Sequence, residues 1–353
     1  MPEDFNLSCP IPIDRHDTIQ MAHGGGGRLM QRLIDDLFVA VFSGTAERKT
    51  RSPLHDSTVL DAGGARLAFT TDTFVVNPLF FPGGDIGKLA VCGTVNDLAM
   101  SGADPKWLSA GFILEEGFPI EALQRIVQSM QKTAESAGVR IVTGDTKVVD
   151  RGKGDGLFIN TAGIGLVPDG IDISPARVQP GDVVLVSGDL GRHGIAIMSV
   201  REGLQFEGAL ESDCDSLCEL VAAMRRVGAH LHCLRDLTRG GLAAALNEIA
   251  GAARVGVELE EAAIPVAPQV AGACEMLGLD PFYVANEGRL VAMVAAEAAE
   301  TILQIMNGHQ AAHGPAIIGR ITGDHAGCVE LKGGLGGSRI LDLLSGEQMP
   351  RIC

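Results

Sequence analysis

Aromatic side chains are scarce in this sequence of 353 residues: they make up 4% of it, with one tryptophan and one tyrosine. Hydrophobic residues nevertheless reach 46%, so the chain can build a large core that is mainly aliphatic. Charged residues amount to 20%, and this composition speaks against global disorder. The length suits two domains of ordinary size.

Basic residues are also in short supply. The chain has 28 Lys and Arg against 44 Asp and Glu, for a formal net charge of −16. Such a chain repels nucleic-acid backbones and anionic membranes, so we expect neither as a partner. Nucleotides are not excluded, because carboxylates can hold them through Mg²⁺. No signal peptide and no apolar run of about 18 residues is present, which predicts a reduced, cytoplasmic protein.

Several common motifs are missing. No Cys-x-x-Cys pair occurs among the eight cysteines, which speaks against a structural zinc site. The glycine spacing before Lys88 does not fit a Walker A loop, and no Ser or Thr follows the lysine. Neither a Gly-x-Ser-x-Gly elbow nor a His-Glu-x-x-His motif occurs. Any nucleotide site here must therefore be of a less common kind.

The chain is predicted to consist of four parts. Residues 1–18 are polar and contain three prolines, which is typical of a loose extension. A first mixed α/β domain is expected over 19–170 and a second over 171–344, because prolines cluster between them and both stretches mix strand and helix patterns. Residues 345–353 lack the pattern of any regular element and are predicted to form a mobile tail.

Acidic residues recur at four places where turns or an apolar helix are expected. Carboxylates at strand ends suit Mg²⁺ held between phosphate oxygens, and Lys147 could add a point charge to a phosphate. Turns and helix caps alone also explain such residues. Asp97 differs, because a carboxylate within the apolar helix 85–101 needs a partner. The four segments are Thr70–Thr73, Asn96-Asp97, Gly144-Asp145-Thr146-Lys147 after the expected strand Arg140–Thr143, and Asp236-Leu237-Thr238.

Three further features bear on chemistry. The glycine run Gly24–Gly27 opens a helical pattern and could cradle phosphates with its backbone N–H groups, although flexible linkers look the same. Glu287 precedes an apolar strand; it is either a general base or a surface carboxylate. His193, in a Gly-Arg-His-Gly turn, fits a turn or cap better than a catalyst.

The last residue is a cysteine, Cys353. An exposed terminal thiol is open to oxidation, so a chance cysteine and a functional one are equally plausible from composition. Prenylation of the common kind needs a cysteine four residues from the end, so we do not expect a lipid anchor at Cys353. Ile352 could fill an apolar notch and Arg351 could pair with a carboxylate, which would dock the tail.

Taken together, these segments closely resemble the HypE family of NiFe-hydrogenase maturation factors, which are carbamoyl dehydratases within the aminoimidazole ribonucleotide synthetase and selenophosphate synthetase superfamily. The match extends in order over about residues 18–353. It rests on His23–Arg28, Pro78–Lys88, Gly93–Ala99, Ile141–Val149, Ala285–Arg289 and Pro350–Cys353.

The resemblance implies a two-domain α/β (α+β) fold of the aminoimidazole ribonucleotide synthetase type. The sheet of the N-terminal domain would be shared across a homodimer, with ATP bound in a cleft built partly across it. A HypF-like carbamoyltransferase would load a carbamoyl group onto Cys353. ATP would drive its dehydration to a thiocyanate, and a HypC–HypD complex would accept the cyano group for the iron of the hydrogenase.

Site roles follow from the same resemblance. Cys353, Lys147 and Glu287 would be catalytic, with Glu287 as proton acceptor. Mg²⁺ would bind to carboxylates, and ATP to a larger set of residues. The metal set is Asp72, Asp97, Asp145 and Asp236; the ATP set adds Gly24, Gly25, Gly26, Gly27, Asn96, Gly144, Thr146, Lys147 and Thr238. Arg192 stands where the family pattern leads us to expect Asp.

Two alternatives remain open from the sequence. One is a small-molecule ATP-dependent synthetase or kinase of the same superfamily, which would have no need of a terminal thiol. The other is a scaffold without catalytic activity whose tail docks a partner.

Overall fold

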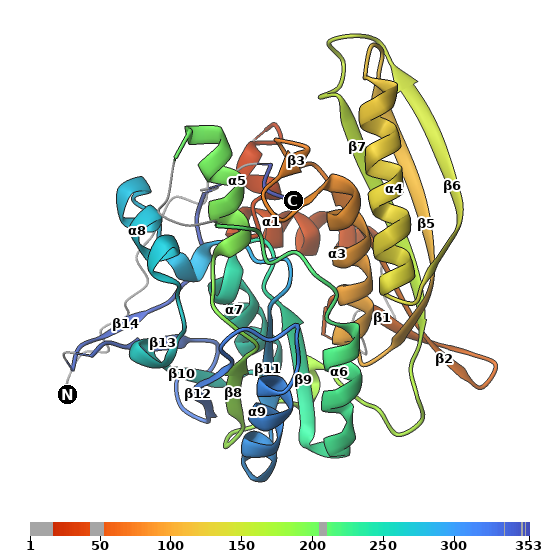
Figure 1. Ribbon diagram of the computed structural model, residues 1–353. Helices are drawn as coiled ribbons and strands as arrows, with labels where there is room; N and C mark the ends of the chain where they lie inside the picture. The colour runs from red at the N-terminus through yellow and green to blue at the C-terminus, as the bar shows by residue number, and fades with distance from the viewer. Residues whose placement is uncertain (1–16, 43–52, 205–209, 335, 347–348, 350) are drawn as a thin grey trace.

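The computed structural model describes residues 17–42, 53–204, 210–334, 336–346, 349 and 351–353. The predicted extension 1–18 lies almost entirely outside this range. Two sheets, each covered by helices, form the body of the molecule (Figure 1). No helix within the described ranges is both long and apolar enough to cross a membrane.

The first sheet has the strand order β1-β2-β7-β5-β6. Only β5 and β6 run parallel, because the helix α4 (Ile120–Ser136) carries the chain back between them. The helix begins after Pro119 and ends before Gly138, as its sequence predicts. The strands are β1 (Thr58–Ala62), β2 (Ala65–Phe74), β5 (Asp104–Glu115), β6 (Arg140–Val149) and β7 (Leu157–Leu166).

One face of this sheet is covered by α4 and by α3 (Ile86–Met100), as Figure 1 shows. The Asp85 carboxylate caps α3 by accepting from the Gly87 N–H at 2.7 Å and the Lys88 N–H at 3.2 Å. Small residues let α3 lie close to the strands: a Cβ at Gly93 would come within 2.9 Å of the Phe74 ring. The helix is therefore buried on nearly every side, which fixes the position of Asp97.

The other face of the first sheet is uncovered. Phe69, Trp107 and Ile113 point to it and are exposed, and the edge strand β6 is exposed along almost its whole length. A sheet face of this composition is normally buried against another layer.

The second sheet has the order β14-β13-β10-β12-β8-β11-β9. Helix α7 (Gly241–Ala253) packs on one face, whereas α6 (Cys218–Met224) and α9 (Ala299–Asn307) pack on the other (Figure 1). Its strands are β8 (Val183–Val186), β9 (Leu231–Asp236), β10 (Gly256–Glu260), β11 (Leu290–Val294), β12 (Ala316–Thr322), β13 (Val329–Lys332) and β14 (Ser338–Ile340).

Helices α5 (Arg192–Glu202) and α8 (Pro268–Leu277) join the core of the first sheet rather than that of the second. The same core takes in Ile352 near the chain end, so the notch expected for this side chain exists. At the other end, α1 (Arg28–Leu33), a π-helical stretch over Ile34–Val39 and α2 (Ala40–Phe42) follow the glycine run. The short strands β3 (Phe80–Phe81) and β4 (Gly84–Asp85) precede α3.

Two local expectations are wrong. The sequence predicts a turn at Thr70–Thr73, yet this segment lies within β2, which continues to Phe74. It also predicts a turn at 144–147, yet β6 continues through it to Val149. Gly144 lies against the neighbouring strand, where a Cβ would come within 2.2 Å of the Ala110 carbonyl oxygen. The glycine is thus required by close strand pairing and not by a turn.

Candidate active site

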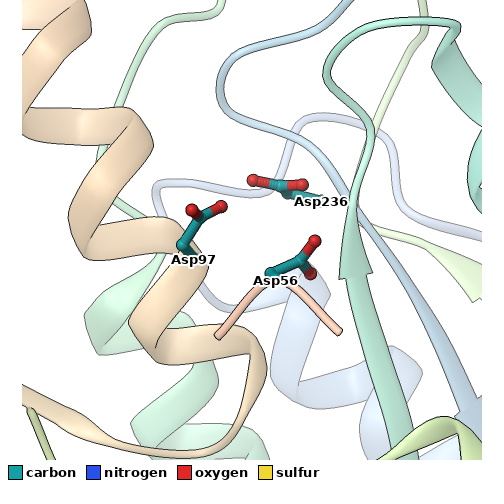
Figure 2. A group of neighbouring side chains, drawn as sticks. All are labelled: Asp56, Asp97 and Asp236. Atoms are coloured by element: carbon teal, nitrogen blue, oxygen red, sulfur yellow. The ribbon is translucent and has the colours of Figure 1, made fainter. Parts of the chain in front are cut away.

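Three carboxylates converge between the two sheets (Figure 2). Asp56, Asp97 and Asp236 each offer an oxygen, and these oxygens lie within 4.8 Å of one another. Asp97 projects from α3, Asp236 ends β9, and Asp56 belongs to the segment before β1. Residues from three separate parts of the chain therefore form one acidic cluster.

Neighbouring groups orient two of these side chains. The Thr70 hydroxyl donates to Asp97 Oδ2 at 2.8 Å. The Arg235 Nε–H group pairs with Asp56 Oδ1 at 2.9 Å. The remaining oxygens Asp56 Oδ2 and Asp236 Oδ2 are buried and have no hydrogen-bond partner among the described residues.

Burial raises the pKa of all three carboxyl groups, and the charges of neighbouring carboxylates raise it further. The pKa of Asp97 lies well above its usual range because of burial first and the charges of Asp236 and Asp56 next. Burial is also the main cause of the raised pKa of Asp236; the charges of Asp56 and Asp72 raise it further, whereas Arg235 opposes the shift. Burial raises the pKa of Asp56 to about 6, although Arg235 opposes the shift. A divalent cation would remove the repulsion.

The donor set fits Mg²⁺. Hard carboxylate oxygens are its preferred protein ligands, and it usually takes only a few of them beside water and phosphate oxygens. Buried oxygens without a partner are unusual unless a ligand completes them. Asp56, Asp97 and Asp236 are therefore the residues that would hold the ion.

Asp72 and Glu287 extend the acidic surroundings of this cluster. The charge of Asp72 acts on the pKa values of Asp97 and Asp236. Glu287 is buried, and its Oε1 has no hydrogen-bond partner in the described part of the chain. Burial raises the pKa of Glu287 well above its ordinary value, followed by the charges of Cys214 and Asp236. Of the two alternatives for Glu287, a buried general base therefore fits the structure better than a surface carboxylate.

A cavity of about 580 Å³ has in its wall Arg239 and Cys353, which interact electrostatically with Asp72 and Glu287, although none of the carboxylates lines it. It is lined by Gly24 and Gly25 from the glycine run, by Thr73 from the end of β2, by Arg239 and by Cys353. Gly26 and Gly27 pack against the chain itself: a Cβ there would come within 2.8 Å of the Arg239 carbonyl oxygen and 2.4 Å of that of Leu344. The glycine run is thereby held at the cavity.

The terminal thiol lies at the wall of this cavity. Burial raises the pKa of Cys353 well above its usual value, and the positive charge of Arg239 opposes this shift. The charges of Glu287 and Asp72 also act on the thiol, so the cysteine is near both. Arg351 pairs with Asp155, as the sequence allowed.

Asn96, a predicted nucleotide ligand, binds the backbone of the chain itself. The buried Asn96 amide accepts from the Leu217 N–H at 2.7 Å and donates to the Asp215 and Glu287 carbonyl oxygens at 2.9 and 3.4 Å. It therefore supports the backbone beside Glu287. The Thr238 carbonyl oxygen accepts from the Gly241 N–H at the start of α7.

The segment Gly144-Asp145-Thr146-Lys147 is not brought to the cluster within one chain. Asp145 and Lys147 pair with each other at 2.7 Å, and their side chains are 70% and 69% exposed. Across the sheet, Asp145 faces Gly111, Gly111 faces Asn160 and Asn160 faces Thr73. Three strand spacings, about 14 Å, thus separate Asp145 from the cavity edge. In this arrangement Asp145 does not reach the carboxylate cluster of its own chain, so it is not a ligand of a metal ion bound there.

Sequence reasoning missed Asp56 and Arg239. Asp56 stands in a polar stretch with no pattern of its own, so only its position in space reveals it. Arg239 follows the predicted segment Asp236–Thr238 directly and could have been included with it. Arg192, the departure from the family pattern, pairs with Asp189 at 2.6 Å.

Two protein-family models match this chain and define the class of protein to which it belongs. Residues 54–167 match the N-terminal domain of the AIR synthase related proteins, and residues 179–332 match their C-terminal domain. The two-domain α/β fold predicted from sequence is therefore confirmed.

The particular family follows from whole-length relatives. The carbamoyl dehydratase HypE of Rhodobacter capsulatus is 51% identical over 339 residues, which cover 96% of this chain and 99% of that protein. A solved HypE in complex with ATP matches with a TM-score of 0.79 and 47% identity, covering 95% of this chain and 100% of that one. HypE in a HypE–HypF complex matches with a TM-score of 0.82 and 45% identity, covering 88% and 99%. The chain belongs to the HypE carbamoyl dehydratase family, as its motifs predict.

The raised carboxylate pKa values predict a pH-dependent stability. A carboxyl group whose pKa is higher in the folded than in the unfolded protein stabilises the fold below its unfolded value, near pH 4, and this contribution is lost as the pH rises through the folded value, about 6 for Asp56. Without metal, the protein should therefore melt at a lower temperature at pH 8 than at pH 5.5. Mg²⁺ should raise the melting temperature more at pH 8.

Asp97→Asn tests the origin of this effect. In metal-free buffer at pH 8 it should stabilise the protein by at least about 1 kcal/mol, because one buried charge is removed. Thermal melts with and without Mg²⁺ and ATP measure the change, and the exposed Asp169→Asn serves as the matched control. An Asp97→Asn protein that melts like the parent at both pH values would contradict the assignment.

Proposed function

We propose that this protein dehydrates an S-carbamoyl group on its own Cys353 to a thiocyanate at the expense of ATP, and so supplies the cyanide ligand for the iron of a NiFe hydrogenase. The observation that carries the proposal is the position of the terminal thiol. It lies at a cavity shared with the glycine run, beside Arg239, and within electrostatic reach of Glu287 and the carboxylate cluster. The names of the relatives agree with this reading.

The reaction makes a poor leaving group into a good one. The carbamoyl oxygen attacks the γ-phosphorus of ATP and ADP departs, which leaves phosphate bonded to the carbamoyl carbon through that oxygen. The nitrogen loses two protons in all, the carbon–oxygen bond breaks, and phosphate leaves as the carbon–nitrogen triple bond forms. Mg²⁺ would neutralise charge on the phosphate oxygens.

The chain supplies the other requirements. Asp56, Asp97 and Asp236, with Asp72 beside them, would hold the Mg²⁺–ATP. Glu287 would accept protons from the nitrogen, since burial raises the pKa of its carboxyl group well above the ordinary value and makes its carboxylate a stronger base. Arg239 would offset negative charge that develops beside the sulfur.

A homodimer would complete the site. The uncovered apolar face of the first sheet calls for a second layer, and an identical face is the simplest partner. Asp145 and Lys147 lie on β6 at one side of this face, whereas Thr73 lines the cavity at the other. Two sheets packed about a twofold axis would bring the Asp145–Lys147 pair of one subunit towards the cavity of the other.

The partners proposed are those of the family. A HypF-like carbamoyltransferase would load Cys353, in line with the HypE–HypF complex known for a relative. A HypC–HypD complex would accept the cyano group. The described cysteines are free thiols, which suits the reducing cytoplasm as the place of action.

The mass of the C-terminal peptide tests the chemistry. With the carbamoyltransferase, carbamoyl phosphate and ATP present, Cys353 should first gain a carbamoyl group and then lose the mass of one water. Cys353→Ala should abolish the product while ATP binding remains. Unchanged ATP-dependent activity after removal of residues 350–353 would instead favour a small-molecule synthetase or kinase.

Subunit mixing tests the shared site. Lys147→Ala and Cys353→Ala proteins should each be inactive alone, because each lacks one half of every site. Mixed by unfolding and refolding, they should regain about a quarter of the parental rate, since half of the dimers are mixed and each of these has one complete site. No recovery, although mixed dimers form, would place both residues in the same chain's site.

A further inference from the structure

The end of the chain is docked by backbone hydrogen bonds around a turn at Arg351, whose φ is 57°. The Val75 N–H donates to a terminal carboxylate oxygen of Cys353 at 3.0 Å, and the Asn77 N–H donates to the Arg351 carbonyl oxygen at 3.2 Å. Residues 351 and 353 thus face the chain beyond β2. The carbonyl group of Ile352, between these two in the sequence, has a different partner.

His193 meets this second carbonyl group. Its Nε2 lies 2.8 Å from the Ile352 carbonyl oxygen, and the ring is fully buried. The ring of Phe81 packs against it edge to face, with 5.4 Å between centroids. Ile352 is itself only 3% exposed, so no water would replace the histidine as donor.

A serine sets the tautomer of this histidine. Ser212 Oγ lies 2.7 Å from His193 Nδ1. A serine hydroxyl that donates to Nδ1 leaves the proton of the neutral imidazole on Nε2, which faces the carbonyl oxygen. Burial lowers the pKa of His193, which favours the neutral ring.

The same loop supports the proposed base. Asp213, next to Ser212, accepts from the backbone N–H groups of Glu287 and Gly288 at 3.3 and 3.2 Å. One stretch of two residues therefore holds both the histidine that meets the tail and the backbone of Glu287. The position of the tail and that of the base are fixed against one another.

We propose that His193 is the positioning residue that locks the C-terminal tail in the register for dehydration, by donating its Nε2–H to the Ile352 carbonyl group. The inference rests on the proposed function for its catalytic meaning but not for the docking itself. The hydrogen bonds of the His193 ring go to Ser212 and to the Ile352 carbonyl group, and not to the thiol of Cys353. Its bond must break whenever the tail leaves the cavity to be loaded, so it acts on the balance between docked and released tail.

Two variants separate the bond from the bulk of the ring. His193→Phe keeps a ring but has no donor, whereas His193→Gln retains an N–H group at about the length of Nε2. In the full-length protein, alkylation of Cys353 by iodoacetamide should be about tenfold faster for His193→Phe and close to the parental rate for His193→Gln. Cleavage after Glu347 yields the peptide 348–353, whose mass reports only this cysteine.

A second readout distinguishes positioning from general damage. With Cys353 carbamoylated beforehand, His193→Phe should lower kcat for dehydration about tenfold and leave the KM for ATP unchanged. Ser212→Ala should shift both measurements in the same direction by less, because the tautomer is then no longer imposed. This variant also keeps the test valid if His193→Phe does not fold.

The possible failures are distinct. Equal alkylation rates for the parent, His193→Phe and Ser212→Ala would overturn the lock, whatever the chemistry of the thiol. Faster alkylation without a loss of kcat would overturn the link to dehydration. A parent protein that never forms a thiocyanate, with the alkylation order still as expected, would sink the proposed function and leave the docking intact.

Discussion

Repulsion among buried carboxylates is the constraint on which this site depends. Asp97 is forced into the interior because α3 is surrounded on nearly all sides, and Asp236 and Asp56 are brought to it by β9 and by the segment before β1. In the absence of a cation, the charges of Asp56 and Asp236 raise the pKa of Asp97, that of Asp56 raises the pKa of Asp236, and that of Asp72 raises the pKa of all three. The fold thus carries an electrostatic cost that binding of Mg²⁺ with a nucleotide would relieve, which couples ligand binding to the joining of the two domains.

In the proposed homodimer, a second chain would complete this arrangement. Lys147, the one cation predicted for the phosphates, stands about three strands from the cavity and pairs with Asp145 in solvent. The uncovered face that carries this pair is also the face that needs burial. Dimerisation and completion of the site would then be the same event, and a dissociated subunit would bind nucleotide without catalysing its use. Arg239 is the cation that each chain already supplies to its own thiol.

Much of this was accessible from the sequence, for reasons particular to each residue. Asp97 could be singled out because a charge within an apolar helix needs a partner, and Asp236 because it ends a strand. Asp56 could not, since its surroundings have no periodicity and its role depends on a contact with β9. Gly144 was misinterpreted because turns and close strand contacts both require glycine, and only the distance to Ala110 separates them. That β6 is the exposed edge strand of its sheet likewise depends on the strand order, which local sequence patterns do not encode.

In the proposed reaction the tail would have to satisfy two opposed demands. Dehydration would require the thiol to be held against Glu287, whereas loading would require it to reach another protein. A few hydrogen bonds, from Val75, Asn77, Arg201 and His193, hold the backbone of the tail, and each one between neutral groups has a modest net strength of about 1 kcal/mol. A docked state built from such bonds is stable enough to dominate yet open to release on the time scale of loop motion. The burial of the Ile352 side chain adds a hydrophobic contribution to the stability of the docked tail, which water cannot replace. A tail held by a large apolar interface would satisfy the first demand and defeat the second, which explains why a polar side chain, His193, stands at the centre of the docking site.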